Sequence, residues 1–402
     1  MPRRPTRVTA RIGGGDAGHR GRALSAPGTH EVAGAAPVEF RPRRGGRVGA
    51  VLSAVGVAVV LGLWALTAAG RTLRAPPFAL SVAVVLLPWL YAATCAGLFA
   101  LWAAVPDRRW PPVALAAAAC TALSLWGPHA GRGAPPADGA EVRVMSWNVR
   151  RLWGGPGAIG RPAEITAATA CVTAAIGRVN PDVLVLLEVT AIDVARLSAS
   201  LGLDCAHNDY EGEGDRDQGG LAVCARGAAR LRSGGPRRFV DQQAWTYVLA
   251  EVEKEGRVFN VLGVHLYPYG FEAAGLGGRL RAGDPGVIAD INRRGETIVK
   301  GQADQSAALV ATASRLRDPT IVAGDFNSTE DSWLHVALRQ RMVDAWEQAG
   351  HGSGSTVSFL GLLPLRVDYV YVGDGVQVRS TEVPSEGCSD HRPVVSDLAL
   401  GG

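Results

Sequence analysis

Three long apolar runs without a charged residue limit what the N-terminal third of this chain can fold into. They cover residues 48–70, 76–106 and 110–128. A membrane-spanning helix needs about 20 predominantly apolar residues. A buried core helix is the alternative, but runs of this length without a charge are rare in soluble cores. The sequence therefore predicts three transmembrane helices within residues 48–128, of which the third is the shortest.

The charges around these runs predict an orientation. Residues 1–47 contain ten Arg against three acidic residues and show no hydrophobic period, so we expect a disordered tail. Clustered Arg remains on the cytoplasmic side of a membrane. The short loops at 71–75 and 107–109 each contain two Arg, so their charges balance and the tail determines the orientation. Three spans then place the remainder of a multi-pass cell-membrane protein on the extracytoplasmic side, after a Gly-, Pro- and Ala-rich linker at 129–140.

Residues 141–402 read as an α/β domain. Residues 133–402 contain 26 Lys plus Arg against 33 Asp plus Glu, and an acidic domain is poorly suited to a polyanion such as DNA. Many strands with few helices suggest packed sheets covered by helices, and a Gly-rich loop is expected at 267–301. The expected strands are 142–147, 182–187, 220–225, 245–251, 258–266, 320–325, 366–372, 376–382 and 394–398, and the expected helices are 163–179, 191–201, 305–316 and 333–341.

The six cysteines form no CxxC pair, which argues against a zinc site or a thioredoxin-like motif. Cys205 and Cys224 fall on what look like neighbouring strands. A disulfide between them is conceivable if the domain is extracytoplasmic.

One expected strand ends abruptly in the turn Gly324-Asp325-Phe326-Asn327. Ile321 and Val322 favour a packed strand, whereas Gly, Asp and Asn interrupt it. The turn presents a carboxylate and a carboxamide at the end of a hydrophobic element, where a scaffold can hold reactive groups rigidly. An ordinary Asx-type turn is the alternative.

Other expected strands end or begin beside chemically similar residues. A carboxylate such as Glu188, after a strand as apolar as 182–187, is costly unless it is paired or bound to a cation. His391 titrates in a range suited to acid–base chemistry, and an acidic partner would favour its protonated form. Each residue alone could be an ordinary strand-end group, but their order, position and chemistry agree. The set comprises Asn148, Glu188, His265, Asp325, Asn327, Asp368, Asp390 and His391.

These residues belong to segments that resemble the successive motifs of the endonuclease/exonuclease/phosphatase superfamily. The resemblance covers about residues 141–398 and implies a four-layer α/β sandwich of the DNase I type with metal-dependent cleavage of a phosphoester or phosphoanhydride bond. The matching segments are Ser146-Trp147-Asn148-Val149, Leu187-Glu188, Gly263-Val264-His265, Gly324-Asp325-Phe326-Asn327, Val367-Asp368-Tyr369 and Ser389-Asp390-His391-Arg392-Pro393.

The resemblance also implies a metal site. Asn148 and Glu188 would hold Mg²⁺, with Asp390 near the ion and Mn²⁺ as the alternative metal. Oxygen ligands of this kind suit Mg²⁺, which takes few protein ligands and keeps several waters.

The remaining matched residues would act on the scissile phosphate. Asp325 and Asn327 would position or activate the attacking water, and His265 and His391 would contact the phosphoryl group. Asp368 would pair with His391, which could act as an acid or as a charge stabiliser. Phosphoryl transfer mostly needs a cation, donors around three oxygens and one oriented nucleophile.

The chain departs from the family pattern at two points. Leu187 stands where many members carry glutamine. Arg150, followed by Arg151, stands where abasic-site endonucleases carry an acidic residue. This argues against the DNA-repair branch and suits a phosphate-rich headgroup such as a diphosphate, although two solvated charges are the alternative.

The architecture resembles membrane-anchored actinobacterial members of the superfamily, among them VanJ-type proteins associated with antibiotic resistance. We therefore expect a Mg²⁺-dependent phosphohydrolase at the outer membrane face that acts on a lipid-linked diphosphate such as undecaprenyl diphosphate. Its expected partners are membrane lipids or lipid-linked phosphates, nucleic acid is less favoured, and no protein partner is implied. The alternatives are a surface endonuclease, a sphingomyelinase-type phosphodiesterase, or a membrane binding or sensing module without catalysis.

Overall fold

The structure, a computed structural model, describes residues 45–104, 111–126, 129–131, 139–155, 160–208, 220–240, 246–268, 286–317, 319–352, 354–359 and 362–401. Residues Gly45–Gly402 form one compact unit. The predicted disordered tail (1–44 of 1–47) and most of the predicted linker lie outside the described residues.

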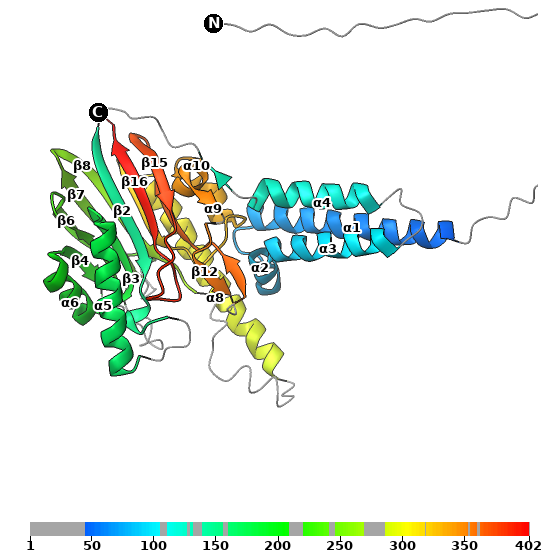
Figure 1. Cartoon of the computed structure of the whole chain (residues 1–402), viewed down its shortest axis with the longest axis horizontal. Coiled ribbons are helices and arrows are strands. Elements are labelled where there is room, and N and C mark those ends of the chain that lie inside the picture. The colour runs from blue at the N-terminus through cyan, green and yellow to red at the C-terminus, as the bar shows by residue number, and fades with distance from the viewer. Residues whose placement is uncertain are drawn as a thin grey trace, which may run out of the picture. The chain divides into compact units, whose positions relative to one another are not determined.

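Two six-stranded sheets stack on each other (Figure 1). The pairs β2–β3 and β8–β9 are parallel, and the remaining neighbours within these two sheets are antiparallel. One sheet has the order β15 (Val376–Glu382), β16 (Val394–Leu400), β2 (Ala140–Asn148), β3 (Val183–Val189), β5 (Gly220–Ala225) and β4 (Asp204–Asn208). The other has the order β10 (Val343–Asp344), β14 (Asp368–Val372), β9 (Thr320–Asp325), β8 (Arg257–His265), β7 (Thr246–Lys254) and β6 (Arg230–Arg238).

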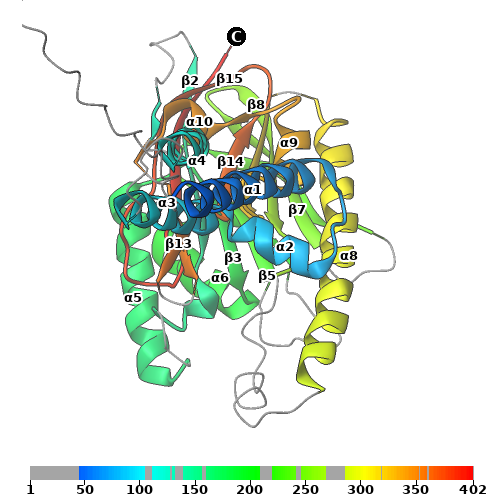
Figure 2. The same cartoon turned by 90° about the vertical axis from the view of Figure 1, so that its right-hand side faces the viewer.

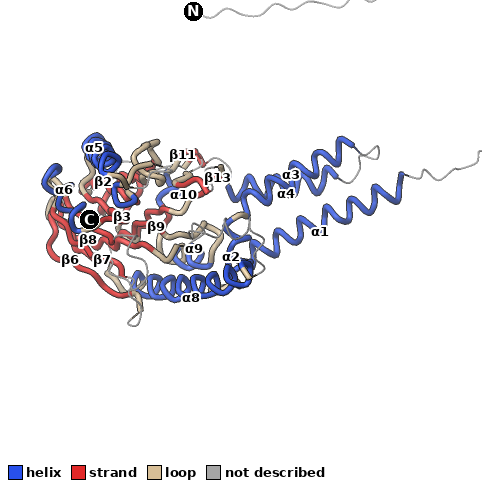
Figure 3. Tube along the Cα trace, turned by 90° about the horizontal axis from the view of Figure 1, so that it is seen from below, coloured by secondary structure: helices blue, strands red, loops and turns tan. Residues whose placement is uncertain are grey.

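Helices cover the outer face of each sheet. In Figures 2 and 3, α5 (Pro162–Val179) and α8 (Val287–Ala313) lie on opposite sides of the strands. Successive side chains of a strand point to opposite faces, so Val183 and Val185 of β3 pack between the sheets. Leu184 and Leu186 pack in the core under α5 and α6 (Ala191–Leu201). The expected α/β sandwich is therefore confirmed.

Several shorter elements accompany the two sheets. They are the 3₁₀ helix Arg150–Leu152, α9 (Trp333–Leu338), α10 (Ala345–Ala349), the pair β1 (His129–Ala130) and β11 (His351–Gly352), and the pair β12 (Val357–Phe359) and β13 (Leu363–Leu365).

The apolar N-terminal runs form α1 (Gly45–Thr72), α2 (Phe78–Val85), α3 (Leu87–Ala104) and α4 (Pro111–Trp126). By length and composition, one helix among the described residues, Ala50–Thr72, could span a membrane. The second run passes the same test only as the bent pair α2 and α3, whose axes differ by 67°. Pro88 is the second residue of α3, two residues after Leu86, where the helix breaks. Proline lacks a backbone N–H and its ring clashes with the carbonyl four residues earlier, so α2 does not continue straight into α3. The prediction of three spans is not confirmed.

The turn between α1 and α2 docks onto the sandwich. Arg71 pairs with the buried carboxylate of Asp331, with Nη2 and Oδ1 2.7 Å apart. The Phe78 N–H donates to Oε1 of Glu296 at 2.9 Å. A Cβ atom on Gly295 would lie 2.2 Å from the Phe78 ring, so only glycine lets α8 approach α2 this closely.

This close approach also explains an error in the sequence prediction. The expected loop 267–301 is wrong over its second part, because α8 begins at Val287 and continues through Gly301. Its glycines disfavour a helix by propensity, but Gly295 is required by the contact with α2. Residues 269–285 lie outside the described residues.

Two disulfides cross-link the domain. Cys205 and Cys224 are directly paired across β4 and β5 and form the bond that the sequence allowed. A second bond, which the sequence did not indicate, joins Cys171 on α5 to Cys388, 217 residues away. Cys388 lies two residues before Asp390, so this bond ties the last motif to α5.

Candidate active site

The register of three strands brings three of the predicted residues together. Asp325, the last residue of β9, lies opposite His265 on β8 and opposite Asp368 on β14. All three side chains are buried. Gly324 permits this arrangement: its φ is +151°, and an added Cβ would lie 1.8 Å from the carbonyl oxygen of Val264.

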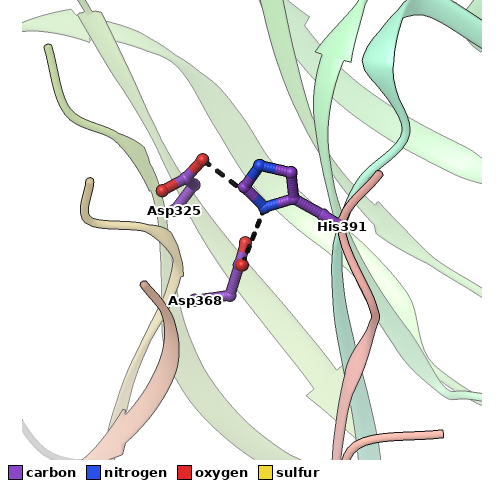
Figure 4. Close-up of side chains that lie close together, drawn as sticks. All are labelled: Asp325, Asp368 and His391. Atoms are coloured by element: carbon purple, nitrogen blue, oxygen red, sulfur yellow. Dashed lines mark hydrogen bonds and ion pairs between the residues drawn. The ribbon is translucent and has the colours of Figure 1, made fainter. Parts of the chain in front are cut away.

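His391 joins this group from the segment before β16. Its Nδ1 lies 2.9 Å from Oδ2 of Asp368 and 3.8 Å from Oδ2 of Asp325 (Figure 4). The Trp147 indole N–H donates to the His391 carbonyl at 3.0 Å and fixes the backbone. Burial lowers the pKa of His391, but Asp368, Asp325 and Asp390 outweigh it and raise that pKa well above its usual value. The ring is therefore protonated at neutral pH, with Nδ1–H directed to Asp368 and Nε2–H left as a donor.

Asn148 and Glu188 approach the same point from neighbouring strands. The register of β3 shifts between Leu187 and Val189, which leaves Glu188 as an extra residue with φ 52°. Such a bulge re-aims a side chain. The Asn148 carboxamide Nδ2 then donates to Oε1 of Glu188 at 2.8 Å and to Oδ2 of Asp325 at 3.2 Å.

His265 stands close to both carboxylates. Its Nε2 lies 3.8 Å from Oδ2 of Asp325 and 4.0 Å from Oε1 of Glu188. Burial lowers the pKa of His265. We refer to Asn148, Glu188, His265, Asp325, Asp368 and His391 as the strand-end cluster.

The strand-end cluster carries more negative charge than its neighbours balance. Burial raises the pKa of Glu188 to about 7. Burial and the nearby Asp368 raise the pKa of Asp325. Among the residues that the structure describes, no lysine or arginine pairs with these two carboxylates or with Asp368. Oδ1 of Asp368 is buried without a hydrogen-bond partner.

This donor set fits a divalent cation. The Asn148 N–H group lies between two carboxylates, which is the position that a cation would take. If the carboxamide turned, its oxygen would join Glu188 as a ligand, and oxygen ligands of this kind suit hard divalent ions. A bound cation would also supply the positive charge that these carboxylates lack. Asp325, Asp368 and His391 likewise offer ligand atoms within 4.8 Å of one another, but the short bond from His391 to Asp368 marks an orienting pair.

Asp390 lies beside this site and pairs with Arg150. Nε of Arg150 is 3.4 Å from Oδ2 of Asp390, and the Arg150 N–H donates to Oδ1 of Asn148 at 3.0 Å. The Arg151 guanidinium instead lies over the Trp153 ring, 5.2 Å from its centroid. Of the two arginines considered as phosphate ligands, Arg150 is thus the one that touches the predicted site residues.

Asn327 shapes the turn after β9. Its N–H donates to Oδ1 of Asp325 at 2.8 Å, and its Nδ2 donates to the carbonyl of Leu266 at 2.9 Å. Its φ of 46° is uncommon for a residue other than glycine. These bonds fix the Asp325 carboxylate, while the predicted contact of Asn327 with a water molecule stays a prediction.

Three supporting residues were not singled out from the sequence. The Ser389 hydroxyl donates to the carbonyl of Asn148 at 2.8 Å. The Thr356 hydroxyl accepts from the N–H of Asp368 at 3.2 Å. The Gln302 side chain donates to the carbonyl of Asn327 at 2.9 Å. Ser389 lies inside a quoted motif and could have been found there, whereas the other two stand in stretches without a signal.

The spatial cluster and the sandwich together define a class of protein. The profile of the Endonuclease/Exonuclease/phosphatase family matches residues 145–391. This match spans more than half of the chain and covers every residue of the strand-end cluster. The chain belongs to the endonuclease/exonuclease/phosphatase family, whose members hydrolyse phosphoester bonds and generally use divalent metal ions.

The individual proteins that resemble this chain share few identical residues with it. A UPF0294 protein of Vibrio cholerae serotype O1 is 28% identical over 125 residues, which are 30% of this chain and 43% of the relative. The chain thus matches less than half the length of this curated relative. A family member of known structure from Bacteroides vulgatus has a TM-score of 0.48 at 17% identity, over 65% of this chain and 99% of the other. A member from Beutenbergia cavernae has a TM-score of 0.48 at 20% identity, over 65% and 72% of the two chains.

Proposed function

We propose that this chain is a membrane-anchored, Mg²⁺-dependent phosphohydrolase that cleaves a phosphoester or diphosphate bond of a lipid-linked substrate. Undecaprenyl diphosphate, at the outer face of the cytoplasmic membrane, is the substrate we favour. The Arg71–Asp331 ion pair is the observation that carries this proposal. Asp331, the partner of Arg71 at the end of α1, follows Asn327 by four residues. At most about 14 Å of extended chain therefore separates Asp331 from the turn after β9. A phosphate held at a membrane surface would be within reach.

The surface of the helices supports a membrane anchor. Large apolar side chains of α1 are exposed, including Val51 at 62%, Leu61 at 54% and Trp64 at 44%. Phe99 on α3 and Leu123 on α4 are exposed at 55% and 67%. Several large exposed apolar side chains on neighbouring helices favour a lipid environment or a partner over water.

Two features support a location of the domain at the outer face of the membrane. Two disulfides within the domain suit an oxidising compartment. The Arg-rich residues 1–47 would remain cytoplasmic.

The metal would be held by Glu188 and Asn148, with Asp390 at its edge. Bound there, Mg²⁺ would act as a Lewis acid that neutralises charge on the phosphoryl oxygens, with Mn²⁺ as the alternative ion. Burial raises the pKa of Glu188 to about 7, which indicates a carboxylate in need of a positive partner.

The residues of this chain would carry the remaining chemistry. Asp325, with its raised pKa, accepts a proton from the attacking water as the water oxygen bonds to phosphorus and the bond to the leaving oxygen breaks. His391, kept protonated by Asp368, donates Nε2–H to a phosphoryl oxygen and stabilises its charge. His265 offers a neutral N–H to the same group. These roles follow the needs of phosphoryl transfer, which depends mainly on positioning and charge stabilisation.

Phosphate release from a panel of substrates tests the proposal. The full chain in detergent micelles is incubated with Mg²⁺ and polyprenyl diphosphate, phospholipid or DNA, beside the isosteric variant Asp325→Asn. We expect release from polyprenyl diphosphate by the wild type and a loss on the order of a thousandfold in the variant. Equal release by both proteins would disprove the proposal. Cleavage of DNA alone would move the chain to the nucleases.

A further inference from the structure

The β12–β13 hairpin is built onto the His391–Asp368 pair. Val357, its first residue, forms an antiparallel bridge with His391. The Thr356 hydroxyl accepts the N–H groups of Val367 and Asp368, each at 3.2 Å. The Thr356 carbonyl accepts the N–H of Arg392 at 2.7 Å. The base of the hairpin is thus bonded on both sides to the segments that carry the two paired residues.

The composition of this hairpin is unusual for an element in water. Residues 357–365 contain no charged side chain, and Ser358 is their one polar residue. Hairpin turns in water commonly carry Asn, Asp or Gly with polar neighbours, whereas Gly361 of this segment has only apolar neighbours in the sequence. Here Leu362 is 81% exposed. A single exposed leucine is ordinary, but one within an uncharged apolar run beside an active site needs another explanation.

The hairpin is also continuous with the apolar helices. Leu365 and Val367 pack with Val85 of α2 in one buried cluster, and Trp89 and Val357 pack against its edge. Figure 1 shows β12 beside α2. The base of the hairpin therefore packs against the helices proposed to lie in lipid. The exposed Leu362 beyond that base should have the lipid around those helices as its partner.

We propose that the β12–β13 hairpin is the lipid-contacting edge of the active site, with Leu362 in the membrane interface. A hairpin held there would bring the phosphate of a membrane lipid to His391 while the acyl or prenyl chain stays in the bilayer. The inference rests on the proposed function in that α1–α4 lie in a membrane. It goes further in naming the element that receives the substrate.

Depth-dependent quenching tests the contact with lipid directly. In a Cys95→Ala/Cys120→Ala background, Leu362→Cys is labelled with an environment-sensitive fluorophore. The full chain is then placed in phosphatidylcholine–phosphatidylglycerol vesicles with nitroxide-labelled lipid. We expect emission to fall at least twofold. The control is Ala199→Cys on α6, an exposed position, where we expect no quenching. Equal signals at the two positions, or a label at 362 that is shielded from water but not quenched by lipid, would overturn the proposal and point to a protein partner.

Kinetics supply a second test. Leu362→Asp should lower kcat/KM for polyprenyl diphosphate in vesicles about tenfold, mainly through KM, and leave hydrolysis of soluble bis(p-nitrophenyl) phosphate unchanged. Ile192→Asp on α6 is the matched control, since Ile192 is also an exposed aliphatic residue, at 63%. Equal kcat/KM in both variants would contradict the proposed contact of the hairpin with lipid. If the wild type releases no phosphate from polyprenyl diphosphate while the label at 362 is still quenched, the proposed substrate fails and the hairpin proposal stands.

Discussion

Two buried polar clusters lie on opposite faces of β9 and β14, and they differ in how their charges are balanced. The strand-end cluster lies at the end of the layer between the sheets. The second, the α9 cluster, lies under α9 and comprises Ser328, Glu330, His335, Asp344, Arg366, Tyr369 and Tyr371. Both clusters contain titratable side chains that are largely closed to solvent, so burial alone does not distinguish them.

In the α9 cluster, each central group has a partner. His335 contacts the Ser328 hydroxyl through Nε2 at 3.0 Å and the Tyr371 hydroxyl through Nδ1 at 2.8 Å. Burial and nearby arginines lower the pKa of His335 well below its usual value, so the ring is neutral. Arg366 pairs with Asp344 at 2.9 Å, and Glu330 lies 3.9 Å away.

The strand-end cluster instead holds carboxylates that no lysine or arginine neutralises among the described residues. A buried charge without its counter-charge lowers stability, and strongly shifted pKa values gather at functional sites. Unbalanced charge, rather than burial, therefore marks the site of chemistry. Substitutions in the two clusters should therefore have opposite consequences.

The largest expected difference is between two buried aspartates. Asp325→Asn should lower kcat on the order of a thousandfold, because it removes the proposed proton acceptor, and it should leave thermal stability unchanged or raised. Asp344→Asn leaves Arg366 short of its closest partner, so the free energy of unfolding should fall by about 3 kcal/mol. The folded fraction of that variant should keep its kcat.

Activity assays and melting curves of both variants in detergent measure this contrast. Circular dichroism at the assay temperature establishes that each variant is folded. Loss of activity without loss of stability in Asp344→Asn, or unfolding of Asp325→Asn, would contradict this difference between the clusters.

The second difference concerns pH and metal. The pKa of Glu188 is raised to about 7 in the folded chain from an ordinary 4.5, so the folded state binds the proton more tightly than the unfolded one. The resulting contribution of Glu188 to the free energy of unfolding is fully present below pH 4.5 and is lost as pH rises through 7. The raised pKa of His391 acts in the same direction above 6.5, whereas the lowered pKa of His265 destabilises the folded state as pH falls below 6.5. Without metal, stability should fall from pH 5 to pH 8.

The variant Glu188→Gln isolates the first of these contributions. With 22% of the side chain exposed, we expect the wild type to lose roughly 2 kcal/mol more than this variant between pH 5 and pH 8. Millimolar Mg²⁺ should restore the wild type at pH 8 and leave the variant unaffected. Thermal unfolding with and without EDTA measures both effects. Parallel pH curves for the two proteins would contradict the assignment of Glu188.

The sequence predicted the strand-end residues because a polar group after an apolar run is visible in one dimension. It could not predict that β9 aligns Asp325 with both His265 and Asp368, since register depends on contacts between strands far apart in the chain. The bulge at Glu188 has the same origin. Propensity failed for α8, where Gly295 serves a contact with Phe78. It also failed for β6, an edge strand whose mostly exposed residues show no alternation. The α9 cluster gave no signal, because its tyrosines and histidine read as ordinary core residues.

The smallest expected effect lies in that cluster. Tyr371→Phe removes the hydroxyl that bonds Nδ1 of His335 and keeps the ring that stacks in the core. A net hydrogen bond of this kind contributes about 1 kcal/mol, so the melting temperature should fall by about 2–4 °C. Because both partners are neutral and Asp325 faces away from them, kcat should stay within about twofold and the pH–rate profile should not move. A tenfold loss of kcat, or a shifted profile, would mean that the α9 cluster controls the turn at Asp325–Asn327. Charge balance would then not separate the structural cluster from the catalytic one.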